Sequence, residues 1–150
     1  MRVVFLVGRV LFVAYFIYAG LQKLMNVAAT AAFYAGKLQV PAALVDAADA
    51  VERTVGLSAM QTLVLIAGTI ELAAAILIAL NVATRAMAVI LMVFTVLGIL
   101  YVHDFWNMAG EARTIALTQA MLYLSLLGGL ALFVATGPAV PGNVEPRADV

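Results

Sequence analysis

Four long runs of apolar residues fill most of the chain, and only a few polar side chains interrupt them. The runs cover residues 3–24, 60–80, 84–102 and 115–135. Each is close to the ~20 residues that an α-helix needs to cross roughly 30 Å of hydrocarbon. The pattern predicts an all-α integral membrane protein in which four helices form one bundle.

The connections between these runs differ in length. The first connection is long and contains an amphipathic pattern, with Leu44, Ala48, Val51 and Val55 on one face and acidic residues opposite. We expect an interfacial amphipathic helix here, which either docks over one mouth of the bundle or lies solvated in the loop. Residues 81–84 leave room only for a tight turn, so the second and third runs should be antiparallel neighbours.

Residues 1–136 therefore form a single predicted transmembrane domain, and the proline-rich residues 137–150 are predicted to be a disordered tail. A cleaved signal peptide is the other explanation for the first run. However, Arg9 interrupts that run and three more apolar runs follow. We expect the first helix to be retained.

Composition narrows the classes of function. The chain is 66% hydrophobic and 11% charged, with zero net charge, so it has no broad basic field and we expect no nucleic-acid binding. It has no cysteine, so thiol centres and cysteine-ligated iron–sulfur clusters are not expected, and one histidine excludes a haem held by two histidines of this chain. His103, Asp104 and Glu111 match no recognised metal-ligand spacing, so no metal site is predicted.

Two charged residues fall inside the apolar runs at similar depth. Arg9 lies six residues after Val3, and Glu71 lies nine residues before Leu80 on a helix of opposite direction. A buried charge needs a partner, so we expect a buried ion pair between Arg9 and Glu71, with Arg85 as a second candidate partner. Glu71 is alternatively part of a ligand site, or a proton carrier whose pKa is raised by burial.

A second polar group gathers at the other end of the predicted bundle. It comprises Lys23, His103, Asp104, Trp106 and Gln119. Lysine and histidine can donate hydrogen bonds to a carbonyl oxygen, as a quinone head group requires, and histidine exchanges protons near neutral pH. These five residues are the predicted ligand-binding set. The alternatives are an interfacial aromatic belt that includes Trp106, and a His103 that only caps its helix.

Several short motifs resemble those of the DoxX-like family of small four-helix membrane proteins. They are Gly8-Arg9, Ala19-Gly20-Leu21-Gln22-Lys23, Gly68-Thr69-Ile70-Glu71, Thr84-Arg85 and the run His103-Asp104-Phe105-Trp106. These motifs end at residue 106, and the resemblance as a whole covers roughly residues 8 to 136. The proline-rich tail departs from the family's ending, so nothing is inferred there.

The resemblance implies a multi-pass protein of the bacterial inner membrane with cytoplasmic termini, an orientation that the evenly split basic residues do not indicate. Some relatives are subunits of quinone-linked oxidoreductases or accompany redox enzymes. We therefore expect a quinone-binding or accessory subunit in the lipid bilayer, working with a redox enzyme partner or as a homo-oligomer. Whether the chain itself catalyses a reaction is left open. The alternatives are a non-catalytic scaffold or assembly factor, and a small transporter.

Overall fold

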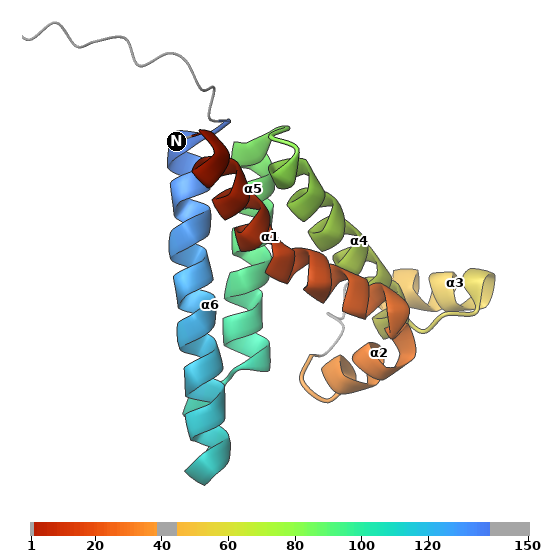
Figure 1. Cartoon of the computed structure of the whole chain (residues 1–150). Coiled ribbons are helices and arrows are strands. Elements are labelled where there is room, and N and C mark those ends of the chain that lie inside the picture. The colour runs from red at the N-terminus through yellow and green to blue at the C-terminus, as the bar shows by residue number, and fades with distance from the viewer. Residues whose placement is uncertain (1, 39–44, 139–150) are drawn as a thin grey trace, which may run out of the picture.

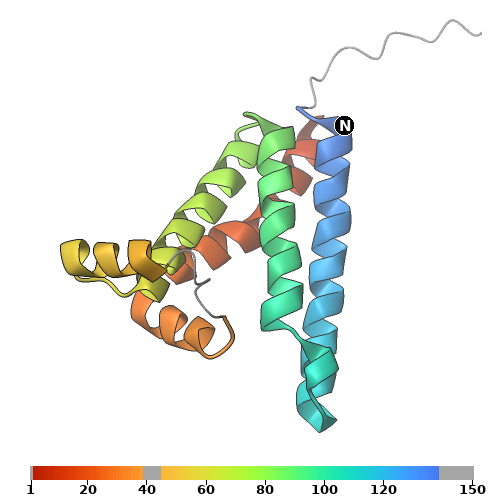
Figure 2. The same cartoon turned by 180° about the vertical axis from the view of Figure 1, so that it is seen from behind.

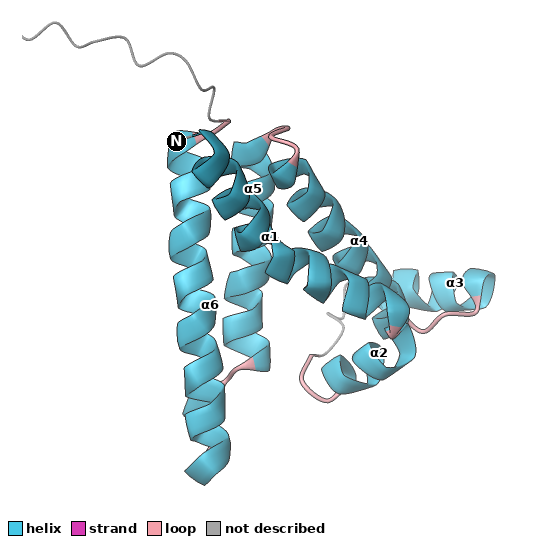
Figure 3. Cartoon of the chain, in the orientation of Figure 1, coloured by secondary structure: helices cyan, strands magenta, loops and turns pink. Residues whose placement is uncertain are grey.

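The computed structural model describes residues 2–38 and 45–138, and within these ranges the chain is helical without strands (Figure 3). The elements in chain order are α1 (Arg2–Met25), α2 (Val27–Ala35), α3 (Val45–Val55), α4 (Ala59–Ala79), α5 (Thr84–Leu97), the π-helical turn η2 (Gly98–Val102), the 3₁₀ turn η3 (Phe105–Asn107) and α6 (Gly110–Thr136). The predicted all-α class is confirmed.

The long helices form two antiparallel pairs. α1 packs chiefly on α4, α5 packs chiefly on α6, and contacts between α4 and α5 join the pairs. α1 and α4 slope away from the more upright α5 and α6 (Figure 1), and the rear view shows α5 and α6 side by side (Figure 2). The start of α1, the α4–α5 turn and the end of α6 lie together at one end of the molecule (Figure 1), which we call the terminal end.

Long apolar helices with outward-facing large side chains identify a multi-pass membrane protein. Four helical stretches are long and apolar enough to cross a bilayer: Val3–Met25, Ala59–Ala79, Thr84–Asn107 and Gly110–Thr136. Their outer surfaces carry exposed residues such as Leu11 and Leu132, whose exposed fractions are 68% and 66%. In water such a surface would favour aggregation, whereas in a membrane the apolar lipid chains surround it.

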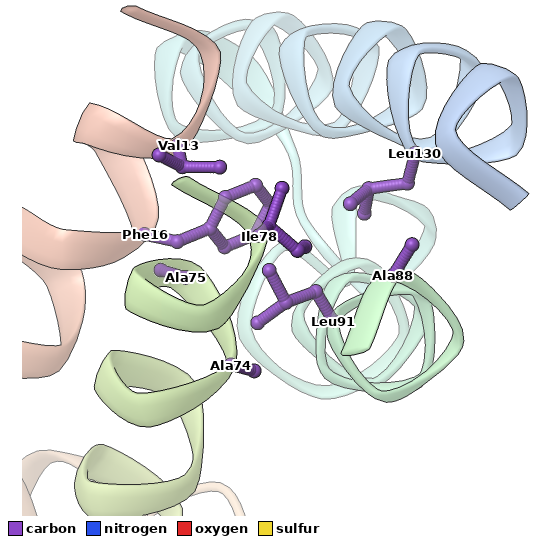
Figure 4. Packing of buried hydrophobic residues seen from close by; sticks show 8 residues of the cluster. All are labelled: Val13, Phe16, Ala74, Ala75, Ile78, Ala88, Leu91 and Leu130. Atoms are coloured by element: carbon purple, nitrogen blue, oxygen red, sulfur yellow. The ribbon is translucent and has the colours of Figure 1, made fainter. Parts of the chain in front are cut away.

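A small core joins the two helix pairs near the terminal end. Val13 and Phe16 of α1 meet Ile78 of α4, and Leu91 and Leu130 extend the cluster to α5 and α6 (Figure 4). Lipid tails are as apolar as these side chains, so the helices gain little from leaving lipid and depend on close packing instead. The alanines Ala74, Ala75 and Ala88 in the same cluster permit that close packing.

The closest helix contact is the crossing of α1 over α4. A Cβ atom added to Gly20 would lie 2.9 Å from the Leu72 Cβ and 3.0 Å from the Leu72 backbone nitrogen. A Cβ added to Gly68 would lie 2.9 Å from the Lys23 Cβ. These two glycines therefore let the backbones approach more closely than any larger residues would allow.

Several local features differ from expectation or refine it. The predicted amphipathic segment is helical as α3, although Leu44 lies outside the described residues, and α2 is a further helix that the sequence pattern did not predict. The tight turn is formed with left-handed backbone at Asn81 (φ 63°) and Ala83 (φ 47°). Of the predicted tail, only residues 137 and 138 fall within the described residues.

The glycine crossing leads to a test of helix packing. We expect Gly20→Ala to destabilise the protein by about 1–3 kcal/mol, because the new methyl group meets α4 backbone as well as a side chain. Gly8→Ala is the matched control, since it lies in the same helix and its added methyl group has open space around it. Unfolding in detergent would measure both variants, and equal stability would contradict the role of Gly20.

Candidate functional site

A cavity of about 280 Å³ opens between the two helix pairs, on the side of the core away from the terminal end. Its walls are mostly apolar, with side chains from α1, α2, α4, α5, η2 and α6. The polar groups in these walls are Lys23, Glu71, Thr95 and the tyrosines Tyr15, Tyr34, Tyr101 and Tyr123. The Thr95 hydroxyl is already used, because it donates to the Leu91 carbonyl at 2.7 Å.

Among the residues that the structure describes, the charged side chains in the cavity wall are Lys23 and Glu71, which form an ion pair. The Lys23 Nζ donates to the Glu71 Oε2 at 2.5 Å, and the two side chains are only 17% and 7% exposed. The Lys23 Cβ lies over Gly68, so Lys23 and Gly68 are at the same level of the α1–α4 contact. A helical Cα–Cβ bond tilts toward the helix N-terminus, so the lysine leans along α1 toward Glu71, one turn further along α4.

The predicted pairing of Glu71 with Arg9 is therefore wrong, although both residues are buried as expected. Arg9 lies eleven residues before Gly20, roughly 16 Å along α1, whereas Glu71 lies only three residues, roughly 4.5 Å, past Gly68 in the same direction. The depth estimate from the sequence assumed that the helices run perpendicular to the membrane and begin at the same membrane surface. The two helices instead cross obliquely, which displaces α1 along α4 and brings Lys23, not Arg9, to Glu71.

Arg9 binds the end of α4 instead. Its Nη1 donates to the Asn81 side-chain oxygen and to the Ile78 carbonyl at 3.4 Å. Ile78 is in the last turn of α4, and its carbonyl also accepts from the Asn81 backbone N–H at 3.0 Å. The C-terminal end of a helix favours a cation. Arg85 is also not a partner of Glu71, since it is exposed and packs against Gly137 at the terminal end.

A pair of tyrosines bridges the two helix pairs at the cavity. The Tyr15 and Tyr123 hydroxyl groups are 2.6 Å apart, which links α1 to α6 directly. Tyr123 fits against the π-helical turn because Gly98 has no side chain; a Cβ there would lie 2.6 Å from the ring. The His103 ring meets the other side of Tyr123 edge to face, with ring centres 4.7 Å apart.

The other predicted ligand-binding residues lie outside the cavity wall. His103 touches Tyr123 and does not line the cavity, and Asp104 faces Lys37, whose Nζ is 4.0 Å from its carboxylate. Trp106 is 48% exposed and packs on Phe105, and Gln119 is exposed rather than directed inward. Of the five predicted residues, only Lys23 lines the cavity.

Sequence reasoning missed the tyrosines and paired Glu71 with Arg9, whereas the structure pairs it with Lys23. Gly98 was the feature of the sequence that could have indicated Tyr123, because a glycine within an apolar helix often makes room for a large side chain of a neighbouring helix. Tyr34 comes from the unexpected helix α2, and burial raises the pKa of its phenol. At neutral pH that hydroxyl stays protonated and can donate a hydrogen bond.

The resulting site combines an apolar chamber with a few hydrogen-bonding groups at one wall. An ammonium group, a carboxylate and several phenols can bind a molecule that carries carbonyl or hydroxyl oxygens, while the apolar walls hold its rings or chains. No cluster of three or more metal-ligating side chains occurs in residues 2–38 and 45–138.

The fold and this site define a small, four-span helical membrane protein with an internal cavity. Comparison with family models matches the DoxX model over residues 4–104, so the chain belongs to the DoxX family. No protein of curated function matches the chain, and neither does any solved structure. The family assignment confirms the resemblance seen in the sequence motifs.

The Lys23–Glu71 pair leads to a double-mutant prediction. We expect Lys23→Met alone to cost roughly 3–5 kcal/mol, because it leaves a buried carboxylate without a cation. Adding Glu71→Gln should recover part of that loss, giving a coupling of about 1–3 kcal/mol in detergent unfolding. Arg9→Met combined with Glu71→Gln is the control, and its two effects should add; strict additivity in the lysine pair would exclude the interaction.

Proposed function

We propose that this DoxX family member binds a lipophilic molecule with an oxygen-bearing head group, foremost a quinone, as an accessory subunit of a membrane oxidoreductase. The proposal includes the family's bacterial inner-membrane location, with the termini in the cytoplasm. Its central support is the buried Lys23–Glu71 pair in the wall of an otherwise apolar cavity.

The dimensions and chemistry of the cavity suit such a ligand. Its volume of about 280 Å³ is close to the lower end of the ~300–1,000 Å³ found for small-molecule sites. That volume accommodates a head group and leaves a chain to extend toward lipid. Lys23 has two further ammonium protons besides the one directed at Glu71, and these can bind a carbonyl oxygen.

The tyrosine bridge would hold the opposite side of the head group. Tyr15 and Tyr123 share one hydrogen bond, so at least one hydroxyl proton is left for a ligand oxygen. His103 would act through Tyr123, by fixing the ring that it contacts, and would not touch the ligand. In this arrangement Asp104, Trp106 and Gln119 lie outside the binding set.

A partner enzyme would supply the electrons. The chain has no cysteine for a thiol or iron–sulfur centre and only one histidine. The proposed subunit therefore binds and orients the quinone, and a redox protein at the membrane reacts with it.

Filling the cavity tests this proposal. Ala67 of α4 lines the cavity, so Ala67→Leu should weaken quinone binding at least about tenfold, the equivalent of ~1.4 kcal/mol. Ala73→Leu is the matched control, because Ala73 is on the exposed surface of the same helix. Binding is measured as saturable quenching of the only tryptophan, Trp106, by a short-chain quinone in detergent.

Two outcomes would contradict quinone binding: wild-type protein without saturable quenching, or equal affinity in both leucine variants. If the wild type binds no quinone but copurifies with a membrane enzyme whose activity is unchanged by Ala67→Leu, the scaffold function replaces it.

A further inference from the structure

Arg9 has hydrogen-bonding capacity that the described residues do not use. The residue is only 3% exposed, and its Nη1 binds the end of α4. Its Nε and Nη2 atoms are buried and have no acceptor in the described structure. A guanidinium has five N–H donors, so three of the five, the one on Nε and the two on Nη2, are left over. Buried donors without acceptors point to a missing anion or polar ligand.

The surroundings of Arg9 are positive. Asn81 accepts a hydrogen bond from Arg9 and a long one, at 3.4 Å, from the hydroxyl of Thr84. Arg85 follows directly in the sequence, which places the two arginines at the same end of the bundle. The carboxylates within residues 2–38 and 45–138 are Asp46, Asp49, Glu52, Glu71, Asp104 and Glu111. None of these lies in the start of α1, the α4–α5 turn or the end of α6, and Glu71 is already paired with Lys23.

The backbone adds to this positive potential. α5 begins at Thr84 without a side-chain N-cap, so its first N–H groups are not satisfied by a capping side chain. The start of a helix favours anions through these N–H groups and the helix dipole. A ligand near Arg9 and Arg85 would therefore meet two guanidinium groups and a helix N-terminus.

Two aromatic rings lie beside the Arg9 guanidinium. The guanidinium carbon lies 4.8 Å from the centre of the Phe5 ring and 5.7 Å from that of Phe133. Phe5 is 41% exposed, so it forms the outer wall, and a change of its side-chain rotamer would open a path to Arg9. Arg9 lies seven residues into α1, roughly 10 Å from its start, so a ligand would reach it from the terminal end.

We propose that Arg9 and Arg85 form a phosphate-binding site at the terminal end of the bundle. The phosphate belongs to an anionic phospholipid or to free phosphate, and either presents paired oxygens to the Arg9 fork. Lipid enters beside Phe5 and places its head group between α1 and the start of α5. The site is separate from the cavity and does not depend on quinone binding.

Native mass spectrometry of the detergent-purified full chain tests this site. Phosphatidylglycerol should bind more tightly than phosphatidylcholine, and Arg85→Gln should weaken that binding about fivefold, the equivalent of ~1 kcal/mol. Arg9→Lys keeps the charge but removes the fork, and should weaken binding at least as much. Arg113→Gln is the control, because Arg113 is exposed near the start of α6 at the opposite end.

Inorganic phosphate is the third ligand in this experiment. Displacement of phosphatidylglycerol by millimolar phosphate would support a site for the phosphate group itself, and retention would support lipid as the natural source. Arg85 is exposed, so its variant keeps the test decisive even if Arg9→Lys does not fold. Equal binding of both lipids, or equal loss in Arg85→Gln and Arg113→Gln, would overturn the proposal.

Discussion

The close crossing of α1 and α4 determines the partners of the buried charged residues in the described part of the chain. Gly20 and Gly68 remove the side chains that would hold the two backbones apart, and the crossing point sets how far one helix is displaced along the other. That displacement brings Lys23 to Glu71 and leaves Arg9 at the end of α4. In lipid, an isolated buried charge is costly, so the helix contact and the charge pairing must be compatible with each other.

The two ends of the bundle consequently have different electrostatic characters. Near the cavity, Lys23 and Glu71 neutralise each other, and the other polar groups in the wall are the tyrosine hydroxyls and the hydroxyl of Thr95. At the terminal end, Arg9 and Arg85 have no neighbouring carboxylate among the described residues. One end is therefore suited to an uncharged, oxygen-bearing molecule, and the other to an anion.

Most of the fold could be predicted from the sequence because lipid imposes strict rules. Each span has to be helical and about twenty residues long, so the four apolar runs gave the four long helices. The short helix α2 was missed because its alanine-rich segment shows no clear period. The π-helical turn was also missed, since apolar residues continue through it and the pattern does not distinguish it from an α-helix.

The site was harder to predict because it depends on tilt. Counting residues from each membrane surface correctly indicated that Arg9 and Glu71 are buried, but such counting cannot give the angle at which helices cross. An oblique crossing changes the relative depth of two residues by several ångströms. That change is enough for Glu71 to pair with Lys23 and not with Arg9. Gln119 shows a second limit, because polarity alone did not determine which way its side chain faces.

The arrangement in two helix pairs has a mechanical consequence. The seam between the pairs contains the cavity. Beside the cavity, the seam is crossed by the hydroxyl contact of Tyr15 with Tyr123 and by the hydrogen bond that the Lys37 Nζ donates to the Val102 carbonyl at 2.8 Å. A tilt of one pair against the other about the alanine-rich core near the terminal end would change the width of the cavity. The Lys23–Glu71 pair would stay intact during such a tilt, since both residues belong to the α1–α4 pair.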